Sequence, residues 1–309
     1  MLEPTGGPFV WYDGKLTPWA EATVHATDIG TWSVSSVFEG IRGYWNSEQK
    51  KLFIFQLDAH LERFAQSIRL IRLPNLAFDP AELREGVLDL LHTNQVRADN
   101  YIRPFAYAEA TTFGSLPTGK SHVIINTAPW ASRLQSGKLN TAVVVSWTRI
   151  TDNVLPPRIK ASPNYLNSRY ASEEAHRHGY DSAILLNPNG KVAEGPGMCL
   201  MLVRRGQIIT PSVTSGILES ITRETIMQIA RELLGLEVIE RVVDRTELYV
   251  ADEAFFCGTG LELAPISSVD RLPVGDGRIG PITRHIIECY HDLVRGIDAR
   301  HAEWRTEVM

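Results

Sequence analysis

The hydrophobic pattern changes period early in the chain, and this change restricts which folds the chain can adopt. Residues 8–55 hold short runs of aromatic and β-branched residues around turn signals such as Asp13-Gly14, a pattern typical of strands joined by hairpins. Residues 57–71 and 80–96 instead place apolar side chains three and four positions apart, which is typical of amphipathic helices. The sequence therefore predicts a sheet covered by helices rather than an all-helical or all-β protein.

The strand pattern returns after these helices, at residues 101–110 and 121–130. The polar, turn-rich stretch that follows predicts a linker over residues 128–139. We therefore expect a small α+β domain over residues 1–127 and a larger second domain over residues 140–309. A length of 309 residues agrees with two domains of ordinary size.

The second half again mixes strands with helices. GYDSAILLNPNGKVAEG reads as strand, Asn-Gly turn and strand, which predicts a hairpin around Asn189-Gly190. SITRETIMQIARELLG predicts a helix that Ser220 or Thr222 caps and Gly235 ends. A last amphipathic helix follows Pro281, a residue suited to the first turn of a helix.

Composition excludes several classes of function. The net charge is −5 and no basic cluster occurs, so nucleic acid and anionic membranes are not expected partners. No apolar run reaches the roughly 18 residues of a membrane-spanning helix. The three cysteines form no CxxC pair, so we expect neither a metal site nor a disulfide framework. A reducing cytoplasm fits this cysteine usage.

GSLPTGKS, residues 114–121, satisfies the phosphate-binding pattern G-x-x-x-x-G-K-[ST]. A phosphate-binding loop of this kind must lead from a strand into a helix, because the phosphates bind at the helix N-terminus. The residues that follow, HVIINT, are β-branched and show no helical period. We therefore expect a loop between two antiparallel strands and disfavour a nucleotide-binding protein.

A nucleophilic lysine needs a desolvated site, and the sequence context of the seven lysines differs. Four follow a glycine in a turn and two are adjacent, so all six are expected in solvent. Lys160 follows the apolar Ile159 and precedes a bend of small residues and a helix that begins near Asn164. Spacing alone leaves open whether Lys160 is reactive or an ordinary surface lysine.

RIKASPNYLNSRYASEEAHRHGYDSAILLNPNGKVAEGPG, residues 158–197, resembles the signature of the branched-chain aminotransferase family. That family consists of class IV, fold-type IV enzymes that use pyridoxal 5'-phosphate. SSVFEGIRGY, AHLERF, NYIRPF, SGILESITRET and ADEAFFCGTGLE match further blocks in the family's order. The resemblance covers about residues 10–296 and implies a small α+β domain and a larger pseudo-barrel α/β domain.

The resemblance implies a role for each matching residue at the cofactor. Lys160 would form the internal aldimine and move the substrate's α-proton, and Glu194 would face the pyridine nitrogen. Tyr165 would bond the cofactor's phenolic oxygen. Helix N-termini bind phosphate, and the predicted helix at residues 220–235 offers one. The remaining implied cofactor-binding residues are Arg63, Leu218, Ile221, Thr222 and Thr259.

For the substrate, the resemblance implies that Tyr101 and the Thr259–Gly260 turn bind the α-carboxylate. Arg103 would bind the distal carboxylate of glutamate, and Phe38 and Gly40 would line the side-chain pocket. Tyr101 and Arg103 alternate on a predicted strand, so their side chains should share a face. Packing in a core or on the surface remains the alternative role for both residues.

Three departures from the family pattern concern substrate choice. Ser33 and Arg133 stand where tyrosines are usual, and EGPGMC (194–199) replaces EGSGEN. None of them changes Lys160, Tyr165 or Glu194. Because guanidinium groups bind anions well, Arg103 and Arg133 together would favour an acidic or polar substrate.

The resemblance implies a cytoplasmic, homodimeric or larger aminotransferase. It would move an amino group from an L-amino acid, by default a branched-chain one, to a 2-oxo acid in a ping-pong cycle. Alternatives with the same fold are a D-amino-acid or (R)-amine transaminase and an aminodeoxychorismate-lyase-like enzyme. A relative that binds the cofactor without activity is disfavoured by the intact cofactor residues.

Overall fold

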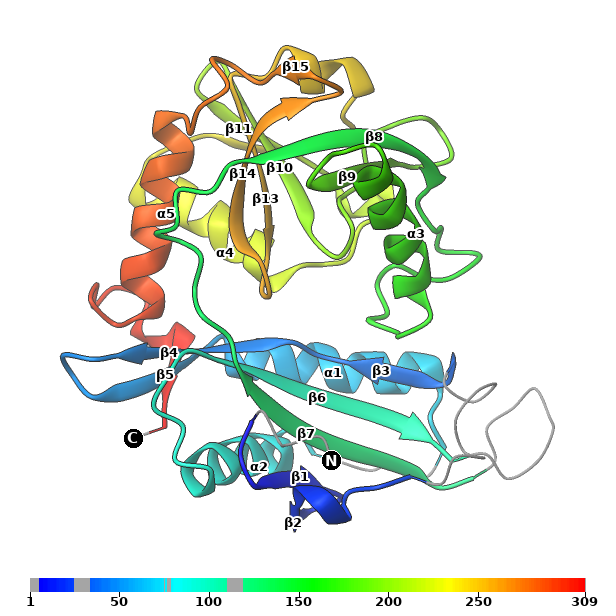
Figure 1. Cartoon of the computed structure of the whole chain (residues 1–309), viewed down its shortest axis with the longest axis vertical. Helices are drawn as coiled ribbons and strands as arrows, with labels where there is room; N and C mark the ends of the chain where they lie inside the picture. Colours follow the sequence, from blue (N-terminus) through cyan, green and yellow to red (C-terminus); the bar gives the residue numbers. More distant parts are fainter. Residues whose placement is uncertain (1–5, 25–33, 75, 77–78, 110–118, 309) are drawn as a thin grey trace. The chain divides into compact units, whose positions relative to one another are not determined.

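The computed structural model describes residues 6–24, 34–74, 76, 79–109 and 119–308. Helices and strands are interspersed along these residues, and the strands among them form two sheets (Figure 1). The predicted α+β class is confirmed. Within the described ranges, no helix combines the length and the apolar character needed to cross a membrane.

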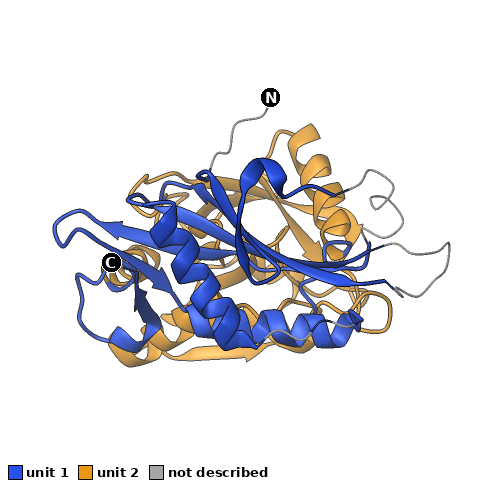
Figure 2. Cartoon of the chain, turned by 90° about the horizontal axis from the view of Figure 1, so that it is seen from below, with its two compact units in different colours: residues 1–132, 159–163, 293–309 blue, residues 133–158, 164–292 orange. Residues whose placement is uncertain are grey.

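The chain divides into two compact units (Figure 2). Unit 1 comprises Met1–Ser132, Ile159–Pro163 and Leu293–Met309, and unit 2 comprises Arg133–Arg158 and Asn164–Asp292. The five residues around Lys160 thus group with the N-terminal part of the chain. The domain boundary predicted between residues 127 and 140 stays a prediction.

Unit 1 contains an antiparallel sheet with the strand order β16-β5-β4-β6-β7-β1-β2, in which β3 also pairs with β6. Its strands are β1 (Phe9–Tyr12), β2 (Lys15–Pro18), β3 (Ser36–Phe38), β4 (Ile41–Asn46), β5 (Lys51–Phe55), β6 (Asn100–Ala108), β7 (Ser121–Pro129) and β16 (Arg305–Glu307). The hairpin predicted at Asp13-Gly14 is confirmed, because β1 pairs with β2 around it.

Two helices, α1 (Leu57–Ile71) and α2 (Pro80–Thr93), pack against this sheet. Their predicted apolar faces supply much of the core of unit 1, together with alternate residues of β4, β5 and β6. Asp79 caps α2 by accepting a hydrogen bond from the Ala81 amide. At the start of α1 the cap position is Gln56, in a left-handed conformation, and Asp58 lies in the first turn.

The phosphate-loop pattern leads into a strand. Residues 110–118, including Gly114, lie outside the described residues, but Ser121 begins β7. Strand β7 pairs antiparallel with β6 along its whole length, from Ser121 opposite Ala108 to Pro129 opposite Asn100. No helix N-terminus follows Lys120, so this segment lacks the phosphate-binding geometry.

Unit 2 contains a sheet with the order β12-β11-β10-β13-β14-β8-β9, and β15 pairs with β14. Its strands are β8 (Asn140–Thr148), β9 (Ser182–Leu186), β10 (Cys199–Arg204), β11 (Gln207–Pro211), β12 (Val238–Arg241), β13 (Glu253–Gly258), β14 (Glu262–Val269) and β15 (Leu272–Pro273). The predicted hairpin after β9 is confirmed, because Leu186 bridges Val192 across the Asn189-Gly190 turn.

Helix α3 (Asn164–Arg177) packs against β8 and β9. Side chains alternate along a strand, and β9 uses both faces. Ala183 and Leu185 join the small cluster under α3, whereas Ile184 joins the larger core of unit 2. Strand β9 is therefore packed on both faces. Arg149 lies one residue after β8 and Glu194 lies in the hairpin after β9, so both residues adjoin this fixed strand.

Helix α4 (Ile221–Gln228) continues as a π-helical turn, η5 (Ile229–Leu233), which the sequence did not predict. Ser220 caps α4 and Gly235, at φ +63°, follows the last turn, as expected. Helix α5 (Pro281–Val294) begins where Glu253 accepts hydrogen bonds from the amides of Ile282 and Thr283. The 3-10 turns are η1 (Trp19–Glu21), η4 (Val213–Ser215), η6 (Arg245–Tyr249) and η7 (Ala302–Trp304).

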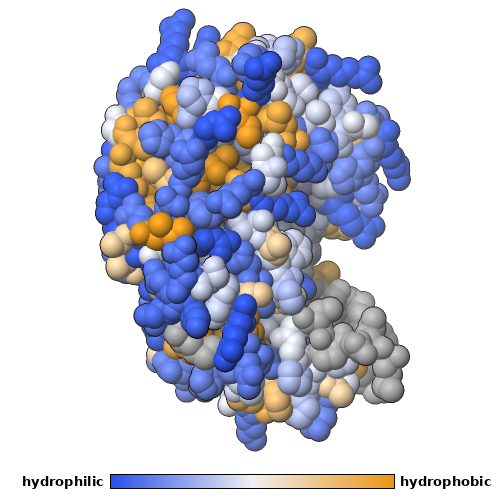
Figure 3. Space-filling view, turned by 60° about the vertical axis from the view of Figure 1, so that its left-hand side comes forward, coloured by the Kyte–Doolittle hydropathy of each residue, from blue (hydrophilic) through white to orange (hydrophobic). Residues whose placement is uncertain are grey.

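The described surface carries exposed apolar side chains, among them Trp19, Trp130 and Trp147. Figure 3 shows hydrophobic residues among hydrophilic ones on one face. Exposed apolar side chains of this kind are normal for a folded protein.

Candidate active site

The residues predicted to form the site belong to both units, and each set is described within its own unit. Unit 1 holds Phe38, Gly40, Arg63, Tyr101, Arg103 and Lys160. Unit 2 holds Tyr165, Glu194, Leu218, Ile221, Thr222, Thr259 and Gly260. Ser33, one of the departures from the family pattern, lies outside the described residues.

Lys160 is fixed beside β3 of unit 1. Its carbonyl oxygen accepts a hydrogen bond from the Phe38 amide at 3.1 Å, and its amide donates to Ser67 Oγ on α1 at 3.2 Å. The next residue, Ala161, forms an antiparallel bridge with Val37. Residues 160 and 161 thus pair with β3 like a short additional strand. This pairing sets the direction of the Lys160 side chain.

The Lys160 side chain is half-buried, and its Nζ lies 4.8 Å from the centroid of the Phe38 ring. A cation over an aromatic face gains about 0.5–2 kcal/mol, depending on solvation. The other lysines lie in more open places. Lys15, Lys50, Lys120 and Lys138 are exposed, and the side chains of Lys51 and Lys191 remain 41% and 40% exposed. Lys160 thus has the aromatic neighbour and the backbone anchoring that a positioned amine requires.

Glu39 directly follows Phe38, is fully buried and binds two basic side chains. Its Oε1 accepts from Arg63 Nε at 2.7 Å, and its Oε2 accepts from Arg63 Nη2 and from His60 Nδ1, each at 2.8 Å. Burial alone would raise the pKa of Glu39, but Arg63 and His60 outweigh burial and hold it well below its usual range. Because the ionised carboxylate only accepts, His60 must carry its proton on Nδ1.

The family resemblance implied that Arg63 binds the cofactor and assigned no role to Glu39 or His60. The structure shows that Glu39 orients Arg63 through two parallel hydrogen bonds, a geometry that fixes a guanidinium firmly. Burial lowers the pKa of His60, so His60 is neutral near neutral pH despite its carboxylate partner. The sequence held one signal for this cluster, the spacing of its residues. His60 and Arg63 are three apart on α1 and so are neighbours on the helix surface, and Glu39 adjoins Phe38.

Tyr101 and Arg103 share one face of β6, as predicted, whereas Ile102 and Pro104 between and beside them are buried. The Tyr101 hydroxyl lies directly over Gly40, since a Cβ built on Gly40 would come within 1.7 Å of the hydroxyl oxygen. Glycine at position 40 is therefore a steric requirement of the tyrosine's place. The Arg103 guanidinium lies 5.3 Å from the Phe38 ring centroid, so Phe38 contacts both cations.

Glu194 in unit 2 is buried and accepts hydrogen bonds on both carboxylate oxygens. Arg149 Nη2 lies 2.6 Å from Oε1, and the Leu218 amide donates to Oε2 at 3.2 Å. The Cys199 thiol lies 3.7 Å from Oε2. Burial and the Glu194 charge raise the pKa of Cys199 well above its usual range, so Cys199 acts as a thiol donor. Glu194 is thus an ordered, ionised carboxylate; no sequence pattern pointed to Arg149.

The start of α4 has the features of an anion site. Ser220 Oγ accepts a hydrogen bond from the Arg223 amide at 3.2 Å and so caps the helix. The amides of Ile221 and Thr222 lie nearer to the helix N-terminus than the Arg223 amide. First-turn amides have no partner within the helix and carry the positive end of its dipole. Thr222 Oγ1 lies 3.1 Å from Thr259 Oγ1. Two hydroxyls and two helix-terminal amides therefore converge, which suits a phosphate group.

Tyr165 lies in the first turn of α3, against Gly197 of the EGPGMC stretch. A Cβ built on Gly197 would lie 3.3 Å from Tyr165 Cε1, and Gly197 has φ +77°, a conformation that favours glycine. The glycine thus lets the backbone approach the tyrosine ring. The departure at Pro196 and Met198 leaves this contact intact.

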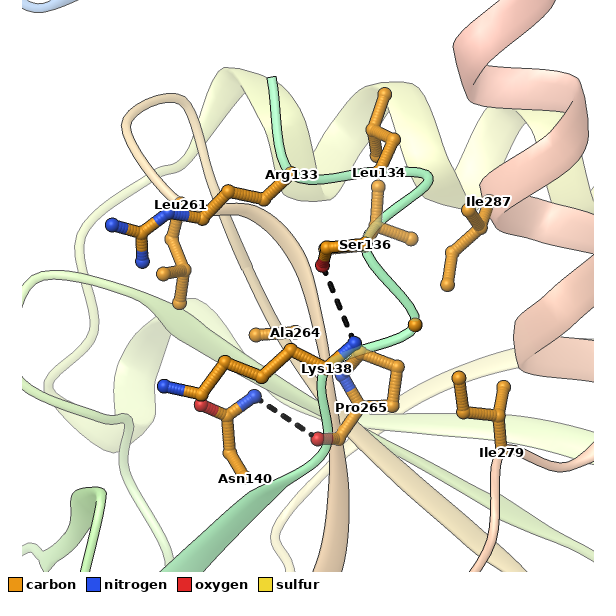
Figure 4. Close-up of a pocket in the computed structure, with 12 residues that line it drawn as sticks. Arg133, Leu134, Ser136, Lys138, Asn140, Leu261, Ala264, Pro265, Ile279 and Ile287 are labelled. Atoms are coloured by element: carbon orange, nitrogen blue, oxygen red, sulfur yellow. Dashed lines mark hydrogen bonds between the residues drawn. The ribbon is translucent and has the colours of Figure 1, made fainter. Parts of the chain in front are cut away.

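Arg133, the other departure, lines a small pocket within unit 2 (Figure 4). Its amide donates to the buried Glu262 Oε2 at 2.6 Å, and its side chain reaches toward Leu261, away from Ile279 and Ile287. The cavity measures about 30 Å³, which is room for one or two water molecules. This pocket is too small for an amino-acid side chain.

The residues present fit pyridoxal phosphate as a group. An anchored amine matches the chemistry of its aldehyde, and an ordered buried carboxylate matches that of its ring nitrogen. The anion site of two threonines at a helix N-terminus matches its phosphate. Among the described residues, no group of three or more His, Cys, Asp or Glu side chains is arranged to hold a metal ion.

The sequence profile of the family described as Amino-transferase class IV matches residues 36–269, and the chain belongs to this family. It is 37% identical over 309 residues to a probable branched-chain-amino-acid aminotransferase of Aquifex aeolicus, covering 100% of this chain and 99% of that protein.

Solved structures agree. The chain is similar to the branched-chain amino acid aminotransferase of Thermobaculum terrenum in its PLP form, with a TM-score of 0.96, 49% identity and 99% of both chains covered. It is also similar to the T.th. branched-chain amino acid aminotransferase in complex with N-(5'-phosphopyridoxyl)-L-glutamate, with a TM-score of 0.91, 35% identity and coverage of 99% and 100%. The aminotransferase fold and class predicted from the sequence are confirmed.

Proposed function

We propose that the protein is a pyridoxal-phosphate-dependent aminotransferase that moves an amino group from a branched-chain L-amino acid to a 2-oxo acid. The observation that carries this proposal is the buried, ionised Glu194 held between Arg149 and the Leu218 amide. A permanent negative charge of this kind would stabilise the protonated, cationic form of a pyridine nitrogen. Branched-chain names and a PLP-form structure among the similar proteins support the same reaction.

The cofactor supplies an electron-withdrawing ring that takes up the electron pair left when the substrate's α-carbon loses its proton. Lys160 would hold the cofactor through its Nζ and would move the substrate's α-proton at the same atom. Glu194 would keep a proton on the ring nitrogen, and Tyr165 would donate to the phenolic oxygen. The amides of Ile221 and Thr222, the hydroxyls of Thr222 and Thr259, and Arg63 would hold the phosphate, and Leu218 would lie beside the cofactor.

For the substrate, Tyr101 and the Thr259–Gly260 turn bind the α-carboxylate. Phe38 and Gly40 border the side-chain pocket, and the Phe38 ring, 4.8 Å from Lys160 Nζ and 5.3 Å from the Arg103 guanidinium, places an apolar surface beside two cations. Arg103 binds the distal carboxylate when glutamate is the amino donor. The complex of the similar T.th. enzyme with a phosphopyridoxyl-glutamate supports glutamate as one partner of the ping-pong cycle.

We also propose that the enzyme is cytoplasmic and forms a homodimer or larger homo-oligomer. Its three cysteines are free, and two of them are buried, which suits a reducing compartment. Light scattering of the purified protein tests the oligomeric state: a dimer or larger assembly is expected, and a monomer at micromolar concentration contradicts it.

An amino-donor panel tests the proposed function. Purified holoenzyme is assayed with 2-oxoglutarate and the L- and D-forms of leucine, isoleucine, valine, phenylalanine and aspartate. Transfer from L-leucine, L-isoleucine and L-valine is expected to exceed transfer from the other donors. Preference for the D-amino acids would replace the proposal with its alternative of the same fold, a D-amino-acid transaminase. Preference for L-aspartate would instead support the hypothesis that Arg103 and Arg133 select an acidic substrate.

A further inference from the structure

We infer that Arg149 is a positioning residue for the cofactor site, holding both the carboxylate of Glu194 and the segment that leads into the phosphate-binding helix. The inference rests on the proposed function, since it concerns how the residues of that site are held. Arg149 follows β8 and is 6% exposed.

The backbone directs Arg149 and Glu194 to the same place. The Arg149 amide donates to the Leu186 carbonyl at 2.8 Å, and the Leu185 amide donates to the Glu194 carbonyl at 2.9 Å. Both residues thus flank the end of β9, one on each side. This arrangement explains how two residues 45 positions apart form an ion pair of 2.6 Å.

The guanidinium of Arg149 contacts three separate segments of unit 2. Its Nη2 binds Glu194 Oε1, its Nε donates to the Gly216 carbonyl at 3.2 Å, and its Nη1 lies 3.4 Å from Asn167 Oδ1 on α3. Glu194 in turn accepts from the Leu218 amide. Arg149 and Glu194 therefore hold Gly216 and Leu218, the two ends of a segment that lies just before Ser220 and α4.

Electrostatics gives Arg149 a second effect. A carboxylate removed from water tends to take up a proton, and a neighbouring guanidinium prevents this because arginine stays charged. A protonated Glu194 would be a donor toward the ring nitrogen instead of an acceptor, and the ring nitrogen would lose its proton. Burying an ion pair is costly, so its retention here agrees with a need for the charge itself.

The test measures cofactor affinity and the pH dependence of the visible spectrum in the parent, Arg149→Met and Arg149→Lys. Arg149→Met is expected to bind pyridoxal phosphate about tenfold or more weakly, the effect of losing a hydrogen bond to a charged group. Its spectrum is expected to change with pH where the parent's is flat, because Glu194 then titrates. Arg149→Lys, which keeps the charge, is expected to restore the flat spectrum and part of the affinity.

Arg241→Met is the matched control, since Arg241 pairs with Glu247 at 2.6 Å elsewhere in unit 2 and is expected to leave both readouts unchanged. A loss of thermal stability alone would not add a pH-dependent spectrum, so the spectrum separates positioning from a merely structural role. Folded Arg149→Met with the parent's affinity and a flat spectrum would overturn the inference. If Arg149→Met does not fold, Arg149→Gln replaces it with the same readouts and the same overturning result. A parent that binds no pyridoxal phosphate would instead refute the proposed function.

Discussion

Arg63 on α1 binds Glu39, the residue after β3, through two hydrogen bonds, Nε to Oε1 at 2.7 Å and Nη2 to Oε2 at 2.8 Å. Glu39 is wholly buried, whereas the Arg63 side chain is 12% exposed. The carboxylate thus fixes the guanidinium from its buried side. If Arg63 is a phosphate ligand, Glu39 decides its orientation.

Glu39→Gln should therefore destabilise the protein and weaken cofactor binding together. Removing one charge of a buried pair leaves the other uncompensated and costs about 3–5 kcal/mol. Urea unfolding and cofactor titration measure the two effects. Glu62→Gln is the control, because Glu62 lies on the same helix and is exposed. Equal stability of Glu39→Gln and Glu62→Gln would contradict the role given to Glu39.

Acidification should lower the free energy of unfolding through the same cluster. The folded-state pKa of Glu39 lies below its ordinary value of 4.5, so its contribution is complete above about pH 4.5 and is lost as the pH falls below it. The pKa of His60 is also lowered, from 6.5, so the unfolded chain takes up a proton below pH 6.5 that the folded chain refuses. Both effects have the same sign.

Chemical unfolding between pH 7.5 and 4 measures this dependence. Stability should begin to fall below about pH 6.5, as His60 comes into play, and fall further below about pH 4.5. His60→Gln should remove the first part of the decrease and keep the second. A parent whose stability is constant over the whole range would refute the assignment.

Gly40→Ala should displace Tyr101. An added Cβ would come within 1.7 Å of the tyrosine hydroxyl oxygen and 2.5 Å of Cζ, distances that no small adjustment absorbs. We expect KM for the amino acid to rise about tenfold or more, the effect of a lost hydrogen bond to a charged group. Gly43→Ala on β4 is the control, because its Cβ would meet only the tip of Leu52 at 3.3 Å. Steady-state kinetics that do not distinguish the two variants would exclude Tyr101 from carboxylate binding.

Much of the fold could be predicted because local rules and burial agree. Leu83, Val87, Leu90 and Leu91 fall on one face of α2 and are all fully buried. Local rules fail at Gln56, which has a left-handed conformation. Its amide donates a hydrogen bond to the carbonyl of Trp304, a residue almost 250 positions away in the sequence. Strand β14 was missed because Glu262 and Pro265 interrupt its apolar pattern.

The candidate site was predicted from sequence blocks that resemble the family, and the role of Lys160 stays a prediction. Residues that are brought together only by the fold, such as Arg149 and Glu194, leave no signal of this kind in the sequence. Arg149 and Glu194 meet because β8 and β9 pair in one particular register, and Glu39 meets Arg63 because β3 packs near α1. Neither register nor packing can be read from one sequence, so the residues that orient Glu194 and Arg63 were missed, while the roles given to the predicted site residues stay predictions.

Thr222→Val should weaken cofactor binding without unfolding α4. The substitution keeps the shape of the side chain and removes a hydroxyl that lies 3.1 Å from Thr259 Oγ1. A hydrogen bond to a charged group contributes about 1.5–3 kcal/mol, so the dissociation constant should rise about 10- to 100-fold. Thr225→Val is matched to it, because the Thr225 hydroxyl donates to the Ile221 carbonyl within the helix. The anion site is wrongly placed if both variants bind pyridoxal phosphate as the parent does.

The identity of the lysine that carries the cofactor is the most direct measurement of all. Holoenzyme is treated with borohydride, which makes the lysine–cofactor linkage permanent, and the labelled peptide is identified by mass spectrometry. The label is expected on Lys160 alone, and Lys160→Ala is expected to retain no label and no visible absorbance of bound pyridoxal phosphate. A label on any other lysine, or undiminished absorbance in Lys160→Ala, would contradict the account.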